Sequence, residues 1–158
     1  FTNCKLLFLQ FPDSVVRFVA ISWIKELGSD ELVDYLPQLV QALKHETYDA
    51  SPLAKFLLER ALTSPRVAHY LYWLLVQTLP GSSPQVFFLI LIKYFIFLHN
   101  DLNVLEYSEV TATDESSVGI YRYHRRLQIM LRSLLAVSGE TLVQRLMAQQ
   151  VLVKVLKY

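Results

Sequence analysis

Apolar residues recur every three or four positions along four helix-length stretches between residues 15 and 75. This spacing predicts amphipathic α-helices, because such positions fall on one face of a helix with about 3.6 residues per turn. The first helix is expected over residues 14–27, with Asp13 or Ser14 as its N-cap and Gly28 as its stop. Its apolar stripe comprises Val16, Val19, Ala20, Trp23, Ile24 and Leu27.

Ser29 is expected to cap the second helix, whose first turn carries Asp30 and Glu31. Negative charge in that turn favours a helix because it lies at the positive end of the helix dipole. Pro37 falls inside the pattern and predicts a kink or a restart of the helix. The apolar stripe comprises Leu32, Tyr35, Leu36, Leu39 and Leu43.

Two Ser-Pro pairs, Ser51-Pro52 and Ser64-Pro65, each predict the start of a further helix. A serine N-cap before a proline is typical of helix starts, since the first helical position does not need its N–H. The stripes that follow are Leu53, Phe56, Leu57 and Ala61, and then Val67, Tyr70, Leu71, Leu74 and Leu75. These two helices form a second pair.

A third pair is predicted near the C-terminal end, with Ser138-Gly139 between its two helices. The stripe of the first helix comprises Ile120, Tyr123, Leu127, Met130, Leu131, Leu134 and Leu135. The last helix is expected over residues 140–157 and is apolar on nearly all sides after Gln150. Its end is therefore expected to pack against a part of a longer protein.

Helix pairs repeating at about 36 to 38 residues are close to the period of HEAT and armadillo units. The predicted fold is all-α: a short HEAT- or armadillo-like stack of antiparallel helix pairs, or α-α superhelix. Residues 1–158 are expected to form a single domain, since that length suits one core. The chain starts at Phe1 in an apolar stretch and is interpreted as a fragment of a longer chain.

Composition agrees with a packed domain, because 53% of the residues are hydrophobic and only four are glycine. Cys4 is the single cysteine, so the chain can form no internal disulfide and carries no CxxC motif, which favours a reducing compartment. The net charge of +1 hides an asymmetry: residues 119–158 hold 7 basic and 1 acidic residue, whereas residues 86–118 hold 1 and 5. A basic helix face can contact phosphates or acidic lipid, but such faces are more often simply solvated.

Three strings carry a resemblance that periodicity cannot provide. They are SDELVDYLPQLVQALK at 29–44, SPLAKFLLERAL at 51–62 and VAHYLYWLL at 67–75. Their wording resembles the helical accessory (PIK) domain of phosphoinositide 3-kinases, and most of all that of the class II enzymes. The resemblance covers about residues 15–79 and resumes near Val118, at Tyr121-Arg-Tyr-His and between Leu134 and Leu146.

The resemblance implies a non-catalytic helical scaffold that positions membrane- and GTPase-binding modules against a lipid kinase domain. The implied partners are the intramolecular kinase domain and lipid-binding modules, with no nucleic acid and at most peripheral membrane contact. The parent protein would be an ATP-dependent phosphatidylinositol 3-kinase, cytoplasmic and peripheral to membranes, acting in signalling and membrane traffic. ATP and Mg are implied only for the parent's kinase domain. The alternative is a free-standing helical-repeat adaptor without kinase activity.

Residues 86–114 differ from this family as an apolar and then acidic insertion. Twelve of the thirteen residues 86–98 are apolar, a run too short to span a bilayer as a helix. The segment could be an extra buried helix, a membrane-surface or partner-binding element, or translated non-coding sequence retained in a gene model. The abrupt change in composition makes us favour the last, and peptides from 86–110 in the natural protein would contradict it.

The sequence predicts no catalytic, cofactor-binding or metal-binding residue. His99-Asn-Asp-Leu-Asn103 has a passing likeness to a kinase catalytic loop, but the chain has no Gly-rich loop and no Asp-Phe-Gly string. His45, Glu46 and His69 lack any metal-ligand spacing and are interpreted as packed or surface residues.

The remaining candidates are aromatic or basic. Cys4 is expected to be a structural thiol. Trp23, Tyr70, Tyr72 and Trp73 are expected to pack in the core and between helices, so that Trp23→Ala together with Leu71→Ala would cost several kcal/mol. Residues Tyr121, Arg122, Tyr123, Arg125, Arg126 and Arg132 mix basic and aromatic side chains as a nucleic-acid surface would. One basic helix face is insufficient evidence for that, and solvation or contact with a neighbouring domain or an anionic membrane is favoured.

Overall fold

The computed structural model describes residues 13–79 and 115–156. Within them the chain forms helices and no β-strand, which confirms the all-α prediction. The elements are α2 (Ser14–Lys25), α3 (Ser29–Ala42), the short 3-10 helix η1 (Leu43–His45), α4 (Pro52–Thr63), α5 (Pro65–Thr78), α7 (Glu115–Val137) and α8 (Glu140–Val155). The predicted insertion at 86–114, with His99 and Asn103, lies outside the described residues, as does Cys4.

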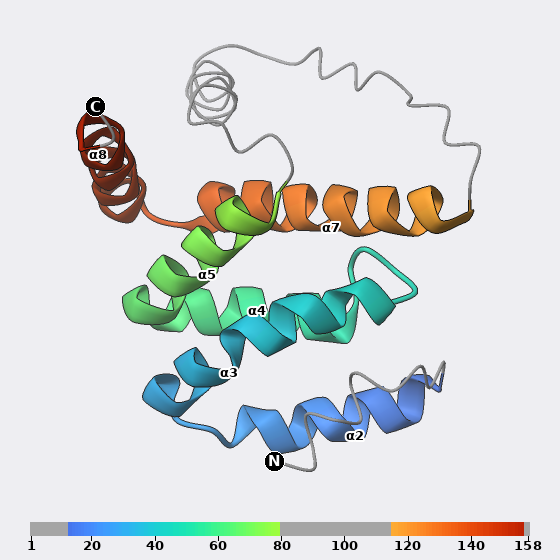
Figure 1. Cartoon of the computed structure of the whole chain (residues 1–158). Helices are drawn as coiled ribbons and strands as arrows, with labels where there is room; N and C mark the ends of the chain where they lie inside the picture. Colours follow the sequence, from blue (N-terminus) through green and yellow to red (C-terminus); the bar gives the residue numbers. More distant parts are fainter. Residues whose placement is uncertain (1–12, 80–114, 157–158) are drawn as a thin grey trace.

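The helices lie in successive layers from α2 at one end to α7 near the other (Figure 1). Helix α4 is central, because it packs against α2, α5 and α7, while α3 packs against α5. The turn η1 contacts both α3 and α7. This arrangement agrees with the predicted stack of helix pairs, in which each pair buries its apolar face against the next.

One continuous apolar core runs through the layers. Leu71 and Tyr72 of α5 and Leu57 of α4 have no exposed surface, and Phe56 is almost fully buried. From α7 the core receives five residues of the predicted stripe, namely Leu127, Met130, Leu131, Leu134 and Leu135, and Tyr123 packs at its edge. Ile120, the first residue of that stripe, is 47% exposed, so its assignment to the packed face is wrong. Helix α8 contributes the buried Leu146, while Leu142, Val143 and Met147 pack against the core at its edge.

Helix α2 packs only part of its predicted stripe against the core. Ala20 and Ile24 are buried as predicted, and Ile21, which is not part of the predicted stripe, is buried as well. Trp23 is 44% exposed and Val19 is 37% exposed, so the assignment of Trp23 to the core is wrong. Tyr70 of α5 is also exposed, whereas Tyr72 is buried and Trp73 half-buried as expected. Apolar residues occupy more than one face of α2, and the period alone does not tell which face packs.

The start of α3 also differs from the prediction. Gly28 is the N-cap and Ser29 is the first helical residue. The Gly28 N–H donates to the Glu31 carboxylate (3.3 Å), while the Ser29 hydroxyl accepts from the Arg60 guanidinium (3.4 Å). Helix α3 runs through Pro37 without restarting. Since Pro37 is exposed, we infer that the loss of one backbone hydrogen bond is tolerated on the solvent side.

Both predicted Ser-Pro starts are confirmed. The Ser51 hydroxyl accepts from the Ala54 N–H (3.2 Å) at the start of α4, and Ser64 accepts from the Val67 N–H (3.5 Å) at the start of α5. Asp13 caps α2 by accepting from the Val15 N–H (2.8 Å). These caps set the helix boundaries because each satisfies an N–H that has no partner inside its helix.

Ser51→Ala is expected to lower the free energy of unfolding by about 1 kcal/mol, because a buried cap is lost and a backbone N–H stays unpaired. Ser64→Ala should cost less, since its hydrogen bond is longer and half-buried. Urea unfolding of the purified chain measures both. Ser22→Ala is the matched control, because the Ser22 hydroxyl only donates to the carbonyl of Val19 on an exposed helix surface. A control as destabilised as Ser51→Ala would contradict this assignment.

Candidate functional site

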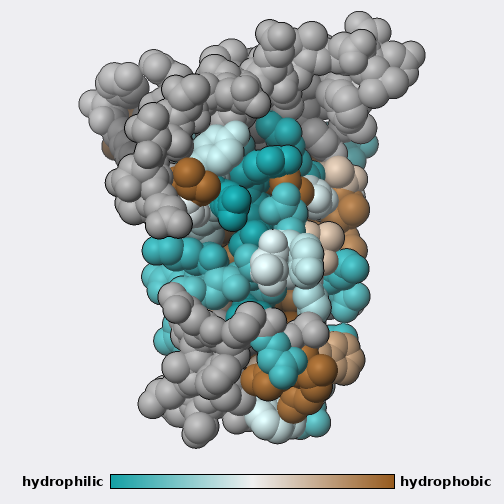
Figure 2. Space-filling view, turned by 90° about the vertical axis from the view of Figure 1, so that its right-hand side faces the viewer, coloured by the Kyte–Doolittle hydropathy of each residue, from teal (hydrophilic) through white to brown (hydrophobic). Residues whose placement is uncertain are grey.

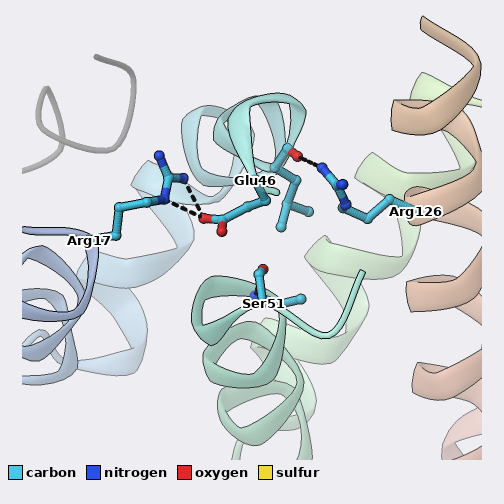
Figure 3. A network of polar contacts seen from close by, with 6 residues as sticks. Arg17, Glu46, Ser51 and Arg126 are labelled. Carbon is cyan, nitrogen blue, oxygen red and sulfur yellow. Dashed lines mark hydrogen bonds and ion pairs between the residues drawn. The ribbon is translucent and has the colours of Figure 1, made fainter. Parts of the chain in front are cut away.

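A buried ion pair joins α2 to the segment that follows η1. Arg17 of α2 donates from Nε (3.2 Å) and from Nη2 to Oε1 of Glu46 (Figure 3). The two side chains are 5% and 3% exposed. Burial is costly for each charge alone, so each residue depends on the other. The pair therefore fixes the position of α2 relative to the turn.

A second arginine reaches the same segment from α7. Arg126 donates from Nη1 to the backbone carbonyl oxygen of Leu43, which belongs to η1 (Figure 3). Its Nε lies 3.5 Å from Oδ1 of Asp49 and makes no hydrogen bond within the part of the chain that the structure describes. We interpret the Asp49 contact as a weak ion pair at the rim and the Leu43 contact as the main anchor.

Residues 43–51, named here the clamped turn, are thus held from two sides. Arg17 and Arg126 bind it from α2 and α7, and Ser51 closes it by capping α4. Thr47, Tyr48, Asp49 and Ala50 are exposed between these anchors. Figure 3 shows Glu46 between the two arginines, with Ser51 below them. The arrangement can hold helices in register, and its buried charged groups Arg17, Glu46 and Arg126 are engaged in contacts within the protein.

The sequence contained a signal for both arginines that the stripe assignment missed. Arg17 is spaced three and seven residues before the buried Ala20 and Ile24. Arg126 is spaced four residues before Met130 and three after Tyr123, in line with the stripe of α7. A charge in register with core positions indicates a buried, paired charge. The expectation of a solvated basic face is therefore wrong for Arg126, whereas Arg122 and Arg125 are exposed as expected.

Polar contacts also join α5 and α8. Nε1 of Trp73 donates to Oε1 of Gln149 (3.4 Å), and the neighbouring Gln150 is buried. Tyr72 lies edge-on to Trp73, and burial raises the pKa of its hydroxyl. Tyr123 of α7 donates its hydroxyl to the carbonyl oxygen of Val40 (3.2 Å), and burial raises its pKa too. The aromatic residues in this region act as packing and hydrogen-bonding groups.

The predicted histidines fall at separate places. His45 lies in η1, next to Glu46, whose carboxylate is engaged with Arg17. His69 is half-buried on α5 and lies edge-on to Tyr70. No group of three or more His, Cys, Asp or Glu residues that could hold a metal occurs in residues 13–79 and 115–156.

Two helices each expose a group of four or more large apolar side chains among the described residues. On α2 these residues are Val15, Phe18, Val19 and Trp23, named here the α2 outer face. At the end of α8 they are Val151, Leu152, Val153, Val155 and, directly after the helix, Leu156, named here the α8 end. Figure 2 shows hydrophobic atoms gathered at the lower end of its face, where α2 lies, and hydrophilic ones in the middle. The exposed α8 residues agree with the prediction that this helix is apolar on nearly all sides.

The structure predicts a pH dependence of stability. Burial, with help from Lys44 and Arg17, lowers the pKa of His45 against an opposing effect of Glu46, and burial lowers the pKa of His124. Both values then lie below the unfolded value of about 6.5, so the unfolded chain binds more protons near that pH. The associated stability is present above about pH 6.5 and is lost as the pH falls through the lower folded values.

His45→Gln with His124→Gln is therefore expected to reduce the drop in urea midpoint between about pH 7.5 and 5.5. The unsubstituted chain, measured in the same buffers, is the reference, because carboxylates contribute equally to the pH dependence of both proteins. An identical drop in the variant and the parent would contradict the role of these histidines.

Among the described residues, no helix is both long and apolar enough to cross a membrane. This finding includes α7 and α8, of which α7 is the longer.

Comparison with known proteins identifies the family of the helical stack. The model of the phosphoinositide 3-kinase family accessory domain (PIK domain) matches residues 2–102. That match contains helices α2 to α5 and the clamped turn. It also includes residues 86–102, the first part of the segment 86–114 that is expected to be an insertion into the family pattern.

Individual relatives agree with the family match. The chain is 55% identical over 78 residues to the human phosphatidylinositol 4-phosphate 3-kinase C2 domain-containing subunit beta, covering 49% of this chain and 5% of that protein. It is 52% identical over 75 residues to the phosphatidylinositol 4-phosphate 3-kinase C2 domain-containing subunit alpha of Pongo abelii. That alignment covers 48% of this chain and 4% of the relative. It is 54% identical over 70 residues to the human phosphatidylinositol 3-kinase C2 domain-containing subunit gamma. That alignment covers 44% of this chain and 5% of the relative. This chain, matched over more than half its length, belongs to the phosphoinositide 3-kinase accessory-domain (PIK) family.

Proposed function

We propose that this chain is the non-catalytic helical scaffold of a phosphatidylinositol 3-kinase. In this role it positions membrane- and GTPase-binding modules against a lipid kinase domain. The observation that carries the proposal is the match of the stack to the accessory domain, with relatives named as phosphatidylinositol 3-kinases. Since the chain covers only 4–5% of those relatives, the remaining parts would supply ATP, Mg and lipid binding, in a cytoplasmic protein peripheral to membranes.

Two features of the structure support a scaffold. The core passes without interruption from α2 to α8, and the clamped turn ties layers that are distant in sequence. A stack of this kind resists bending, because each layer is held by packing against the next. Its surfaces for neighbouring modules should then be apolar and exposed in the chain by itself, as the α8 end is.

The test places charges on the α8 end of the intact protein. Leu152→Asp with Val155→Asp is expected to lower phosphate transfer to phosphatidylinositol vesicles at least about tenfold, because a desolvated charge weakens an apolar contact by over 1.4 kcal/mol. The matched control is Leu62→Asp, on an exposed residue of α4, which should leave transfer unchanged. Equal activity in both variants would contradict the positioning role.

A parallel assay separates the scaffold from its alternative. The purified chain with ATP, Mg and the same vesicles is expected to transfer no phosphate, since catalysis is assigned to the rest of the parent. If the intact protein also transfers none, the free-standing adaptor becomes the better interpretation. If the isolated chain transfers phosphate, the non-catalytic assignment is wrong.

A further inference from the structure

The clamped turn contains an unbroken chain of polar contacts between α2 and α7. Arg17 binds the side chain of Glu46, and the backbone N–H of Glu46 donates to the carbonyl oxygen of Leu43 (3.3 Å). The same oxygen accepts from Arg126 of α7. One carbonyl group is therefore shared between the turn's own hydrogen bond and the arginine of the next layer.

These contacts cross the stack. Arg17 and Glu46 are 29 residues apart, and Leu43 and Arg126 are 83 apart. Helices α3 and α4 lie between α2 and α7 in the layered arrangement (Figure 1). The turn is short and its Leu43 and Glu46 are buried, so a shift of one residue displaces the other. Both arginines are also buried, which leaves them little freedom to follow the turn independently.

We propose that the clamped turn is a conformational link that couples the positions of α2 and α7. Releasing Glu46 from Arg17 loosens the Leu43 carbonyl group. The hydrogen bond through which Arg126 ties α7 to the turn is thereby weakened. The reverse also applies, because coupling between two sites is reciprocal in free energy. A load on the α2 end of the stack thus reaches α7 through one turn, in addition to the general packing of the core. The link is a property of this chain and does not depend on the proposed role in a kinase.

Hydrogen exchange measured on the intact protein by mass spectrometry tests the link. Relative to peptides of α5, Arg17→Met is expected to raise exchange in peptides of α7 around Arg126 by a further factor of about 2 to 30, the range that corresponds to couplings of about 0.5–2 kcal/mol. Arg126→Met is expected to raise exchange in peptides of α2 by a similar factor. The double variant should exchange in α7 no faster than Arg126→Met by itself, because both substitutions open one link.

Three comparisons keep the result interpretable. Arg66→Met removes an arginine from an exposed pair with Asp30 that joins α3 and α5, and it should leave exchange in α7 unchanged. Peptides of α5 report the rise in exchange that comes from the lower global stability of the variant, and the coupling is the rise in α7 beyond it. Equal factors in α5 and α7 would overturn the proposal. Glu46→Gln keeps the backbone N–H and the side-chain size, and it provides a milder release if Arg17→Met fails to fold.

The proposal is also overturned if Arg17→Met or Glu46→Gln raises exchange in α2 while α7 keeps the exchange of the parent. If the increase in exchange of the double variant equals the product of the increases of the two single variants, the proposal is contradicted as well. Independent contacts act additively in free energy, and their effects on exchange therefore multiply.

Discussion

Leu71→Ala is expected to lower the free energy of unfolding by about 2–5 kcal/mol, whereas Trp23→Ala should cost at most about 1 kcal/mol. Leu71 has no exposed surface and lies in the core between α5 and its neighbours, so truncation leaves a cavity among packed side chains. Trp23 is the larger side chain, but it is 44% exposed on the α2 outer face. Size and burial thus predict opposite orders for the two substitutions.

Urea unfolding of the purified chain distinguishes these orders. The two single variants and the double variant should be additive within about 0.5 kcal/mol, because the sites lie in different parts of the stack. A loss for Trp23→Ala equal to that for Leu71→Ala would mean that the α2 outer face is covered in solution. A small loss for Leu71→Ala would contradict the described core.

Arg17→Met is expected to lower the free energy of unfolding by about 3–5 kcal/mol, because the carboxylate of Glu46 then stays buried without its charged partner. Adding Glu46→Leu to this variant should restore most of the loss, since two apolar side chains of similar volume replace the pair without a buried charge. The loss of one partner is thus expected to be costly, whereas the intact pair adds little net stability over two apolar side chains.

The exposed pair provides the control for this experiment. Arg66→Met removes the partner of Asp30 where both side chains face water, and it should cost at most about 1 kcal/mol. If Arg17→Met is as mild as Arg66→Met, the Glu46 carboxylate is not desolvated as described. If Glu46→Leu worsens Arg17→Met, the carboxylate has found another partner.

The family could be recognised from the sequence, because the strings at 29–44, 51–62 and 67–75 keep their order and spacing. The family match and the relatives at 52–55% identity confirm that interpretation. The surfaces that would serve the proposed scaffold were only partly predictable. The apolar α8 end follows from composition, whereas the α2 outer face appears only when the packed face of α2 is known.

The clamped turn shows why part of the candidate site escaped the sequence. Histidine and carboxylate positions can be read from the chain, but the partner of Glu46 lies 29 residues away and that of Leu43 lies 83 away. Spacing in sequence describes only neighbours within a helix or turn. Which buried charges meet across layers depends on how the helices pack.

By itself, the sequence determined the number and approximate bounds of the helix pairs, the Ser-Pro starts of α4 and α5, the break at Ser138-Gly139 and the all-α class, because caps and helical periods are local properties. Only the tertiary structure decided which face of α2 is buried and that Arg17 and Arg126 hold one turn between them. Both outcomes follow from competition among contacts of several helices. An apolar residue such as Trp23 stays exposed when other side chains fill the core, and an arginine becomes buried where a buried carboxylate or carbonyl oxygen accepts its hydrogen bonds.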